Sequence, residues 1–238
     1  MKLINKFSTV HTTAKAGRKI EYIVVHYTAG VTSRDGSAAS LADYYRTTPT
    51  EVSSDFTVDD TSAVQYNGDI RNRYTWHCGG SKYNTKGGSY YGKCTNANAI
   101  GVEICSTNST GKMQNANDKS YYFTDAGLKN ALDLVKYLMK KYSIPADHVI
   151  RHYDVNGKPC PGIIGWNAES GSETEWQKFK NNLTVAGASE KQDVSAGREM
   201  TEQGLFYVQV GAFSSRENAE KYLESVKKVY PQAFIKTM

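Results

Sequence analysis

The chain has 238 residues, with 29 Lys or Arg against 24 Asp or Glu, and its formal net charge is +5. This length allows one large domain or two smaller ones with a real core. The positive excess is mild and the lysines are scattered, so we expect no nucleic-acid partner. No stretch is long and apolar enough to cross a bilayer, and we expect no membrane insertion.

The N-terminus contains basic residues but lacks the apolar segment of a secretory signal peptide. We therefore expect synthesis in the cytoplasm without a signal peptide. Four cysteines, Cys78, Cys94, Cys105 and Cys160, are too few for a disulfide scaffold. Cys105 ends an apolar run and is expected to pack as a small hydrophobe. The sequence leaves open whether Cys78 and Cys94 pair.

The first predicted elements are a buried strand and a short helix. Residues 20–27 are apolar and β-branched, which is typical of a buried strand. Residues 37–45 follow as a helix, with Leu41, Tyr44 and Tyr45 on one side.

Further strands are predicted at residues 55–64, interrupted by a turn at Asp59-Asp60, and at residues 100–105. Between them, residues 74–98 are rich in Gly, Asn, Ser and Tyr. A polar loop of this length usually serves as a lid or a binding wall.

The clearest helix spans residues 124–142, capped by Thr124, with Leu128, Leu132, Val135 and Met139 expected on its inner face. A last helix begins near Ser172 with a capping-box pattern and aligns Trp176, Phe179 and Leu183. Strands that alternate with helices indicate an α/β layer architecture.

The composition changes after Leu183. Residues 184–203 have almost no large apolar side chain and are predicted to be a linker. Order is expected again over residues 204–238, as a strand at 205–213, a helix at 215–229 and a strand at 233–235. The inner face of this helix is predicted to hold Ala219, Tyr222, Leu223 and Val226. The expected organisation is a main domain at 1–183, a linker at 184–203 and a small β-α-β unit at 204–238.

Two histidines and a cysteine suggest a metal site. His26 ends the first predicted strand, where a lone histidine is more often structural. His152 and Cys160 lie eight residues apart in a segment rich in turn formers, so they can meet across a turn. Catalytic zinc commonly takes three such ligands and leaves a fourth position for water. We therefore predict one Zn²⁺ bound by His26, His152 and Cys160.

Two charged residues are candidates for catalysis. Glu103 is an acid inside an apolar strand, where burial is costly unless the carboxylate is paired or functional. It is a candidate general base, and the alternative is an outward-facing position on an edge strand. Lys158 lies two residues before Cys160 and is a candidate for stabilising negative charge, unless it is a solvated turn residue.

The chain resembles the type 2 N-acetylmuramoyl-L-alanine amidases, the family that includes phage endolysins and peptidoglycan recognition proteins. Five stretches carry the resemblance in family order, namely residues 23–29, 53–59, 74–79, 98–103 and 151–162. It implies a central mixed β-sheet flanked by helices, with bacterial peptidoglycan as partner. The implied reaction is zinc-dependent hydrolysis of the amide between N-acetylmuramic acid and L-alanine.

The resemblance also assigns residues. It makes His26, His152 and Cys160 the zinc ligands, Glu103 and Lys158 catalytic, and Trp76, His77 and Asn98 part of the peptidoglycan groove. Many members carry an aromatic residue in the segment matched by Ser54-Asp55, where this chain has none. This departure places more of the catalysis on Glu103 and Lys158.

The C-terminal segment resembles the SPOR domain through residues 207–213 and Asn218-Ala219. That family binds peptidoglycan, notably glycan strands without stem peptides. The resemblance covers about half of the usual fold. A homodimer through this segment is expected to complete it, and the alternatives are a tail that folds poorly or a reduced variant of the domain. Overall the sequence predicts a phage or prophage endolysin that acts on the cell wall after release. The alternatives are a host autolysin, a non-catalytic peptidoglycan receptor, or a cysteine hydrolase that uses Cys160 with His152.

Overall fold

The computed structural model describes residues 1–83, 86–184 and 215–227. The chain divides into two units, residues 1–193 and 194–238, and each is described by itself. None of the helices in these ranges has the length and apolar character that a membrane span requires.

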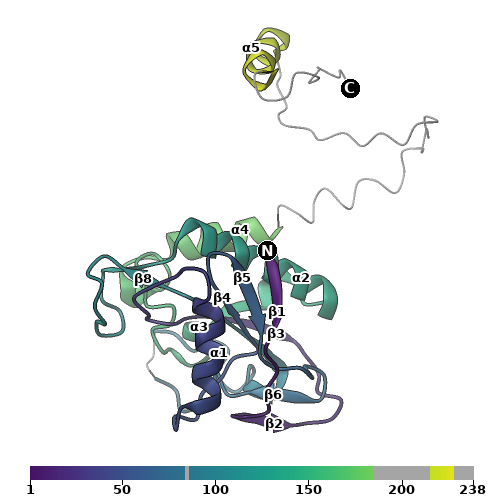
Figure 1. Cartoon of the computed structure of the whole chain (residues 1–238), viewed down its shortest axis with the longest axis vertical. Helices are drawn as coiled ribbons and strands as arrows, with labels where there is room; N and C mark the ends of the chain where they lie inside the picture. Colours follow the sequence, from purple (N-terminus) through teal and green to yellow (C-terminus); the bar gives the residue numbers. More distant parts are fainter. Residues whose placement is uncertain (84–85, 185–214, 228–238) are drawn as a thin grey trace, which may run out of the picture. The chain divides into compact units, whose positions relative to one another are not determined.

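Six strands of the first unit form a mixed sheet in the order β1-β5-β4-β7-β3-β10 (Figure 1). Strands β4, β7, β3 and β10 run parallel, whereas β5 pairs antiparallel with β4 and parallel with β1. The predicted mixed sheet is thus confirmed. The strands are β1 (Lys2–Asn5), β3 (Tyr22–Tyr27), β4 (Phe56–Val58), β5 (Ser62–Gln65), β7 (Ala99–Ile104) and β10 (Val149–Arg151).

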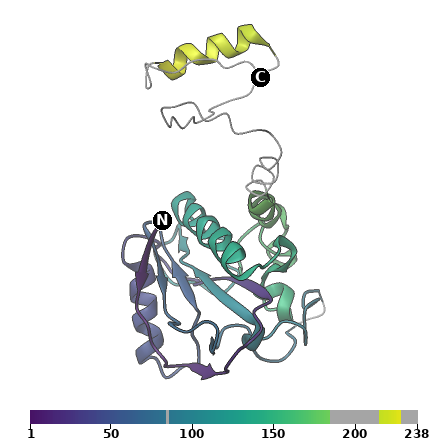
Figure 2. The same ribbon diagram turned by 90° about the vertical axis from the view of Figure 1, so that its right-hand side faces the viewer.

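Helices cover both faces of the sheet (Figure 2). The α2 helix (Asp125–Tyr142) and the α4 helix (Thr174–Thr184) pack on one face, over alternate residues of β3, β4 and β7. The α1 helix (Ser37–Thr47) packs on the other face over β4 and β5. Because α1 covers only β4 and β5 on this face of the sheet, other segments can pack over the ends of β3 and β7.

The predicted helices are present, but their buried faces differ from the prediction. In α2 the buried apolar residues are Ala131, Leu134, Val135 and Leu138. The predicted Leu128, Leu132 and Met139 are only partly buried at the border of the core. In α1 the predicted side with Leu41, Tyr44 and Tyr45 is buried only in part, because Tyr45 is buried whereas Tyr44 is 48% exposed. Helical spacing identified each helix, whereas several apolar residues on each helix left the orientation ambiguous.

Several short elements were not predicted. Strand β1 lies at the sheet edge with mostly exposed residues, so its hydrophobic pattern is weak. Strands β2 (Thr12–Ala14) and β6 (Arg73–Thr75) form an antiparallel pair, as do β8 (Thr107–Asn108) and β9 (Tyr121–Tyr122). The loop predicted at 74–98 begins within β6 and ends in the 3₁₀ helix η1 (Asn96–Asn98).

In the second unit, the structure describes α5 (Arg216–Lys227), within the helix predicted at residues 215–229. The side chain of Tyr222 on this helix is 43% exposed, contrary to its predicted inward position. The predicted strands at 205–213 and 233–235 and most of the predicted linker at 184–203 lie outside the described residues.

Candidate metal centre and active site

Strand register brings the first two candidate residues together. His26 on β3 pairs directly with Glu103 on the parallel neighbour β7. Directly paired residues of neighbouring strands project to the same face of a sheet. Their neighbours Val25 and Val102 project to the opposite face, into the core beneath α2. Both functional side chains therefore lie on the face that α1 covers only in part.

His152 and Cys160 reach His26 through the segment after β10. Strand β10 pairs with β3, and the short helix α3 (His152–Asn156) begins directly after it. Gly157 then adopts a φ of 83°, which turns the chain back, and the Tyr153 backbone N–H donates to the Cys160 carbonyl at 3.0 Å. This turn explains how two residues eight positions apart meet.

His26, His152 and Cys160 offer three ligand atoms that all lie within 4.8 Å of one another. The His26 Nδ1 atom is 3.7 Å from the Cys160 Sγ atom, and the rings of His26 and His152 are 4.8 Å apart. All three side chains are buried. The predicted ligand trio is therefore assembled in one place.

The trio is electrically neutral without a cation. Burial lowers the pKa of His152 to about 3 and lowers that of His26 well below its usual range, while it raises the pKa of the Cys160 thiol to about 12. The buried Nε2 atom of His152 has no hydrogen-bond partner among the described residues. Two neutral imidazoles, a thiol and an unpartnered nitrogen fit a bound metal ion.

Glu103 and Lys158 lie close enough to the trio to influence its charge. Burial raises the pKa of Glu103 to about 7, and the positive charge of Lys158 opposes this rise. The same lysine charge contributes to the lowered pKa of His152. The Lys158 side chain is exposed, so it faces the open side of the site.

The three residues predicted to line a peptidoglycan groove lie in different environments. Trp76 is partly buried and donates from its indole Nε1 to the Thr13 hydroxyl on β2 at 2.9 Å. The side-chain amide of Asn98 makes hydrogen bonds to Thr95, Glu21 and Lys93, so it serves the local fold. His77 is buried, and its Nδ1 atom lies 3.0 Å from His26 Nε2. Substrate contact by these residues stays a prediction.

A buried Asp55 beneath the site was not assigned a role by the sequence analysis. Its carboxylate accepts hydrogen bonds from the Asn67 amide, the Thr75 hydroxyl and the Gly101 backbone N–H at 2.7 to 2.9 Å. Burial raises its pKa, while the nearby Arg18 guanidinium opposes the rise. An acidic residue directly before the apolar strand residue Phe56 was the available signal. Asp55 thus connects β4, β6 and β7 instead of facing substrate.

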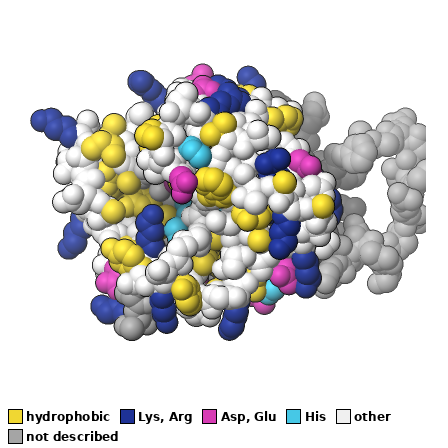
Figure 3. Space-filling view, turned by 90° about the horizontal axis from the view of Figure 1, so that it is seen from below, with side chains coloured by type: hydrophobic (Ala, Val, Ile, Leu, Met, Phe, Trp, Pro, Cys, Tyr) yellow, Lys and Arg dark blue, Asp and Glu magenta, His cyan; other side chains and the backbone are white. Residues whose placement is uncertain are grey.

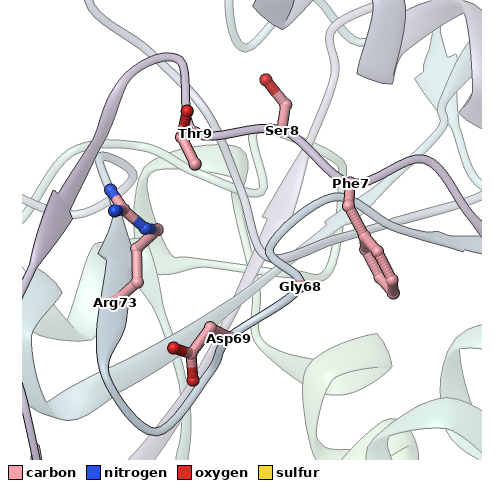
Figure 4. Close-up of a pocket in the computed structure, with 6 residues that line it drawn as sticks. All are labelled: Phe7, Ser8, Thr9, Gly68, Asp69 and Arg73. Carbon is pink, nitrogen blue, oxygen red and sulfur yellow. The ribbon is translucent and has the colours of Figure 1, made fainter.

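A pocket of about 330 Å³ lies elsewhere, between the chain after β1 and the connection from β5 to β6 (Figure 4). The Phe7 ring packs against Gly68, where an added Cβ would lie 2.9 Å from the ring. The lining residues are Phe7, Ser8, Thr9, Gly68, Asp69 and Arg73, and none of them is a candidate catalytic residue.

A sheet flanked by helices that carries a buried His-His-Cys trio defines a class of protein with a candidate metal site. Comparison with known proteins identifies the family. Residues 16–163, more than half of the chain, match the family model described as N-acetylmuramoyl-L-alanine amidase. The chain therefore belongs to the N-acetylmuramoyl-L-alanine amidase family. Residues 202–238 match the SPOR domain.

Individual relatives support this assignment. The chain is 31% identical over 194 residues to the N-acetylmuramoyl-L-alanine amidase CwlA of Bacillus subtilis strain 168, a match that covers 79% of this chain and 62% of CwlA. The solved structure of PlyL is 29% identical with a TM-score of 0.53, covering 77% of this chain and 97% of PlyL. A mutant endolysin from Bacillus subtilis is 29% identical with a TM-score of 0.52, covering 77% of this chain and 99% of that one.

The chain spans 62% of the length of CwlA and 56% of a probable N-acetylmuramoyl-L-alanine amidase from Bacillus licheniformis. The matched structures, in contrast, are covered almost completely. These curated relatives are therefore longer than the region that the chain matches.

Proposed function

We propose that the protein is a zinc-dependent amidase that hydrolyses the amide between N-acetylmuramic acid and L-alanine in bacterial peptidoglycan. The observation that carries this proposal is the buried trio of His26, His152 and Cys160, with Glu103 and Lys158 close to it. Two nitrogen ligands and one sulfur ligand suit Zn²⁺ better than Mg²⁺ or Ca²⁺, which prefer oxygen. Membership of the amidase family supplies the reaction class.

When bound, zinc supplies a Lewis acid that polarises the substrate carbonyl and makes a water molecule more acidic. Glu103 then acts as the general base, and its carboxylate takes a proton from the attacking water. The same carboxyl group returns the proton to the leaving amine nitrogen of L-alanine. A carboxyl group with a pKa of about 7 suits both steps, because it can accept and release a proton near neutral pH.

Lys158 stabilises the negative charge that develops on the carbonyl oxygen. Its side chain is exposed, yet its charge acts on both Glu103 and His152, so it lies at the open edge of the site. A fixed positive charge at that position favours the tetrahedral transition state over the neutral amide.

Two other functions are less well supported. A cysteine hydrolase needs an accessible thiol with a lowered pKa, whereas Cys160 is buried and its pKa is raised to about 12. A receptor that only binds peptidoglycan needs neither a complete ligand trio nor a carboxyl group with a pKa of about 7. The alternative of a receptor is therefore tested by turnover and not by metal content alone.

The biological role that we propose is that of a phage or prophage endolysin acting on the cell wall. Its similarity to PlyL and to an endolysin from Bacillus subtilis supports this role, and a host autolysin with the same chemistry is the alternative. Lys and Arg side chains are spread over the face shown in Figure 3, with hydrophobic and histidine side chains between them. Such a surface is compatible with an anionic cell envelope.

The test combines metal analysis with product analysis on the full chain. We expect about one zinc per chain, and free N-terminal L-alanine from digested cell wall that disappears with a chelator and returns with zinc. Glu103→Gln and Lys158→Met should each lower turnover by about 100-fold or more while zinc stays bound. Lys129→Met on α2 is the matched control, since this exposed lysine pairs with Asp133 on its own helix.

Cleavage that survives complete zinc removal would refute the metal mechanism. Near-normal turnover in both active-site variants would refute the assigned roles. Bound zinc without any release of L-alanine would favour the receptor.

A further inference from the structure

His77 is buried against the candidate metal ligand His26. Its side chain Nδ1 atom lies 3.0 Å from the Nε2 atom of His26, and the planes of the two rings are 88° apart. The residue is only 9% exposed. At this distance, the imidazole of His77 interacts directly with the imidazole of His26.

The backbone around His77 holds the ring firmly. The backbone N–H groups of His77 and Cys78 both donate to the Asn96 side-chain oxygen, at 3.0 and 2.8 Å. The ring rests on Gly101 of β7, where an added Cβ would lie 2.7 Å from the His77 ring. Any larger residue at position 101 would displace the imidazole. The lack of a side chain at Gly101 therefore makes room for the His77 ring.

The hydrogen bond between the two rings determines which nitrogen of His26 is free. The Nδ1 atom of His26 faces the Cys160 Sγ atom at 3.7 Å, so this nitrogen belongs to the ligand trio. A nitrogen that binds a metal must carry a lone pair, and the proton of a neutral His26 must then sit on Nε2. The His77 Nδ1 atom is positioned to accept that proton in a hydrogen bond.

The remaining nitrogen of His77 carries the proton in this arrangement. When Nδ1 accepts, the single proton of a neutral His77 sits on Nε2, which is buried without a hydrogen-bond partner among the described residues.

We propose that His77 is a positioning residue that keeps His26 in its Nε2–H tautomer and directs the Nδ1 lone pair at the metal. This inference rests on the proposed metal function. Partners of this kind fix the ring of a ligating histidine and strengthen metal binding.

The test measures Zn²⁺ affinity of the full chain by competition with a chelating indicator, so it does not depend on amidase activity. We expect His77→Leu, which lacks an acceptor, to weaken zinc binding about 10- to 100-fold. His77→Asn places an oxygen close to the former Nδ1 position and should restore most of the affinity. A general loss of packing would not distinguish these two variants.

His148→Ala is the matched control. His148 also bonds through Nδ1, to the Glu21 carbonyl, and stacks on Tyr22 at the opposite end of β3 from His26. Its removal should leave zinc affinity unchanged. Equal zinc affinity in His77→Leu and in the wild type would overturn the proposal.

A second measurement covers the case in which His77→Leu does not fold. Nitrogen-15 NMR of the wild-type imidazoles should show His26 protonated at Nε2, with His77 as the acceptor. Protonation of His26 at Nδ1 in the zinc-loaded protein would overturn the proposal. An inactive wild type that still shows the expected tautomer and affinities would refute the amidase function and leave this inference intact.

Discussion

At the residue scale, the proposed mechanism depends on the carboxyl group of Glu103. Burial raises the pKa of Glu103 to about 7, and the charge of Lys158 limits that rise. Below this pKa the carboxyl group is protonated and cannot accept a proton from water. The two residues are therefore coupled through charge, in addition to any separate contact with substrate.

This coupling predicts a shift in the pH dependence of kcat/KM. In the wild type, kcat/KM should fall as the pH drops through the pKa of Glu103. Lys158→Met removes the charge that favours the carboxylate, so the pKa of Glu103 rises and the acidic limb moves to higher pH. Lys158→Arg should restore the wild-type limb, because the charge is kept.

The measurement is the pH profile of wall digestion for the three proteins between about pH 5 and 9. An unshifted acidic limb in Lys158→Met, at whatever turnover, would show that Lys158 does not act on Glu103.

At the element scale, the α2 helix gives the sharpest stability prediction. Leu134 is fully buried beneath the sheet, whereas Leu132 is only partly buried at the border of the core. We expect Leu134→Ala to lower the free energy of unfolding by about 2–5 kcal/mol, because it removes contacts and leaves a cavity. Leu132→Ala should cost clearly less.

Denaturant unfolding of both variants with unchanged m-values measures this difference. Equal losses of stability in the two variants, or a larger loss for Leu132→Ala, would favour an orientation of α2 in which Leu132 faces the core, as helical spacing alone suggested.

The pairing of the strands positions the residues of the site. His26 and Glu103 come together only because β3 and β7 are neighbours in register, and Arg151 pairs with Val25 just before His152. A shift of one residue in either register would send a ligand into the core. Asp55 connects the start of β4 and the β6 residue Thr75 to the Gly101 backbone and so helps to hold β7 in place.

At the scale of the whole molecule, the chain joins an amidase unit to a segment that matches the SPOR domain. We propose that this segment binds peptidoglycan, notably glycan strands from which the amidase has removed the stem peptides. We also propose that it pairs with a second copy of the chain.

The full chain should therefore bind stripped glycan strands more tightly than a chain that ends at residue 184, with intact wall as the comparison substrate. Co-sedimentation with purified wall measures binding, and sedimentation velocity measures the oligomeric state of each protein. Equal binding by the two chains would contradict the role of the segment. A monomeric full chain would contradict the dimer.

Much of the fold could be predicted because the strong elements carry their own patterns. The strand around His26, the helix capped by Thr124 and the helix with Trp176 were all predicted, and Thr124 indeed accepts from the Gly127 N–H. The short strands β1, β2, β8 and β9 were not predicted. They are only two to four residues long and mostly carry polar or exposed residues, so pairing partners far along the chain decide them.

The sequence was sufficient to identify the chemical groups of the candidate site, because His26, His152 and Cys160 carry ligand chemistry and Glu103 is an acid within an apolar strand. Folding decided how these groups and their neighbours are used. It buried His77 against His26 and used the amide of Asn98 and the carboxylate of Asp55 for structural hydrogen bonds. The physical reason is that a residue's chemistry is local, whereas burial, tautomer and pKa depend on neighbours that only the folded chain brings together.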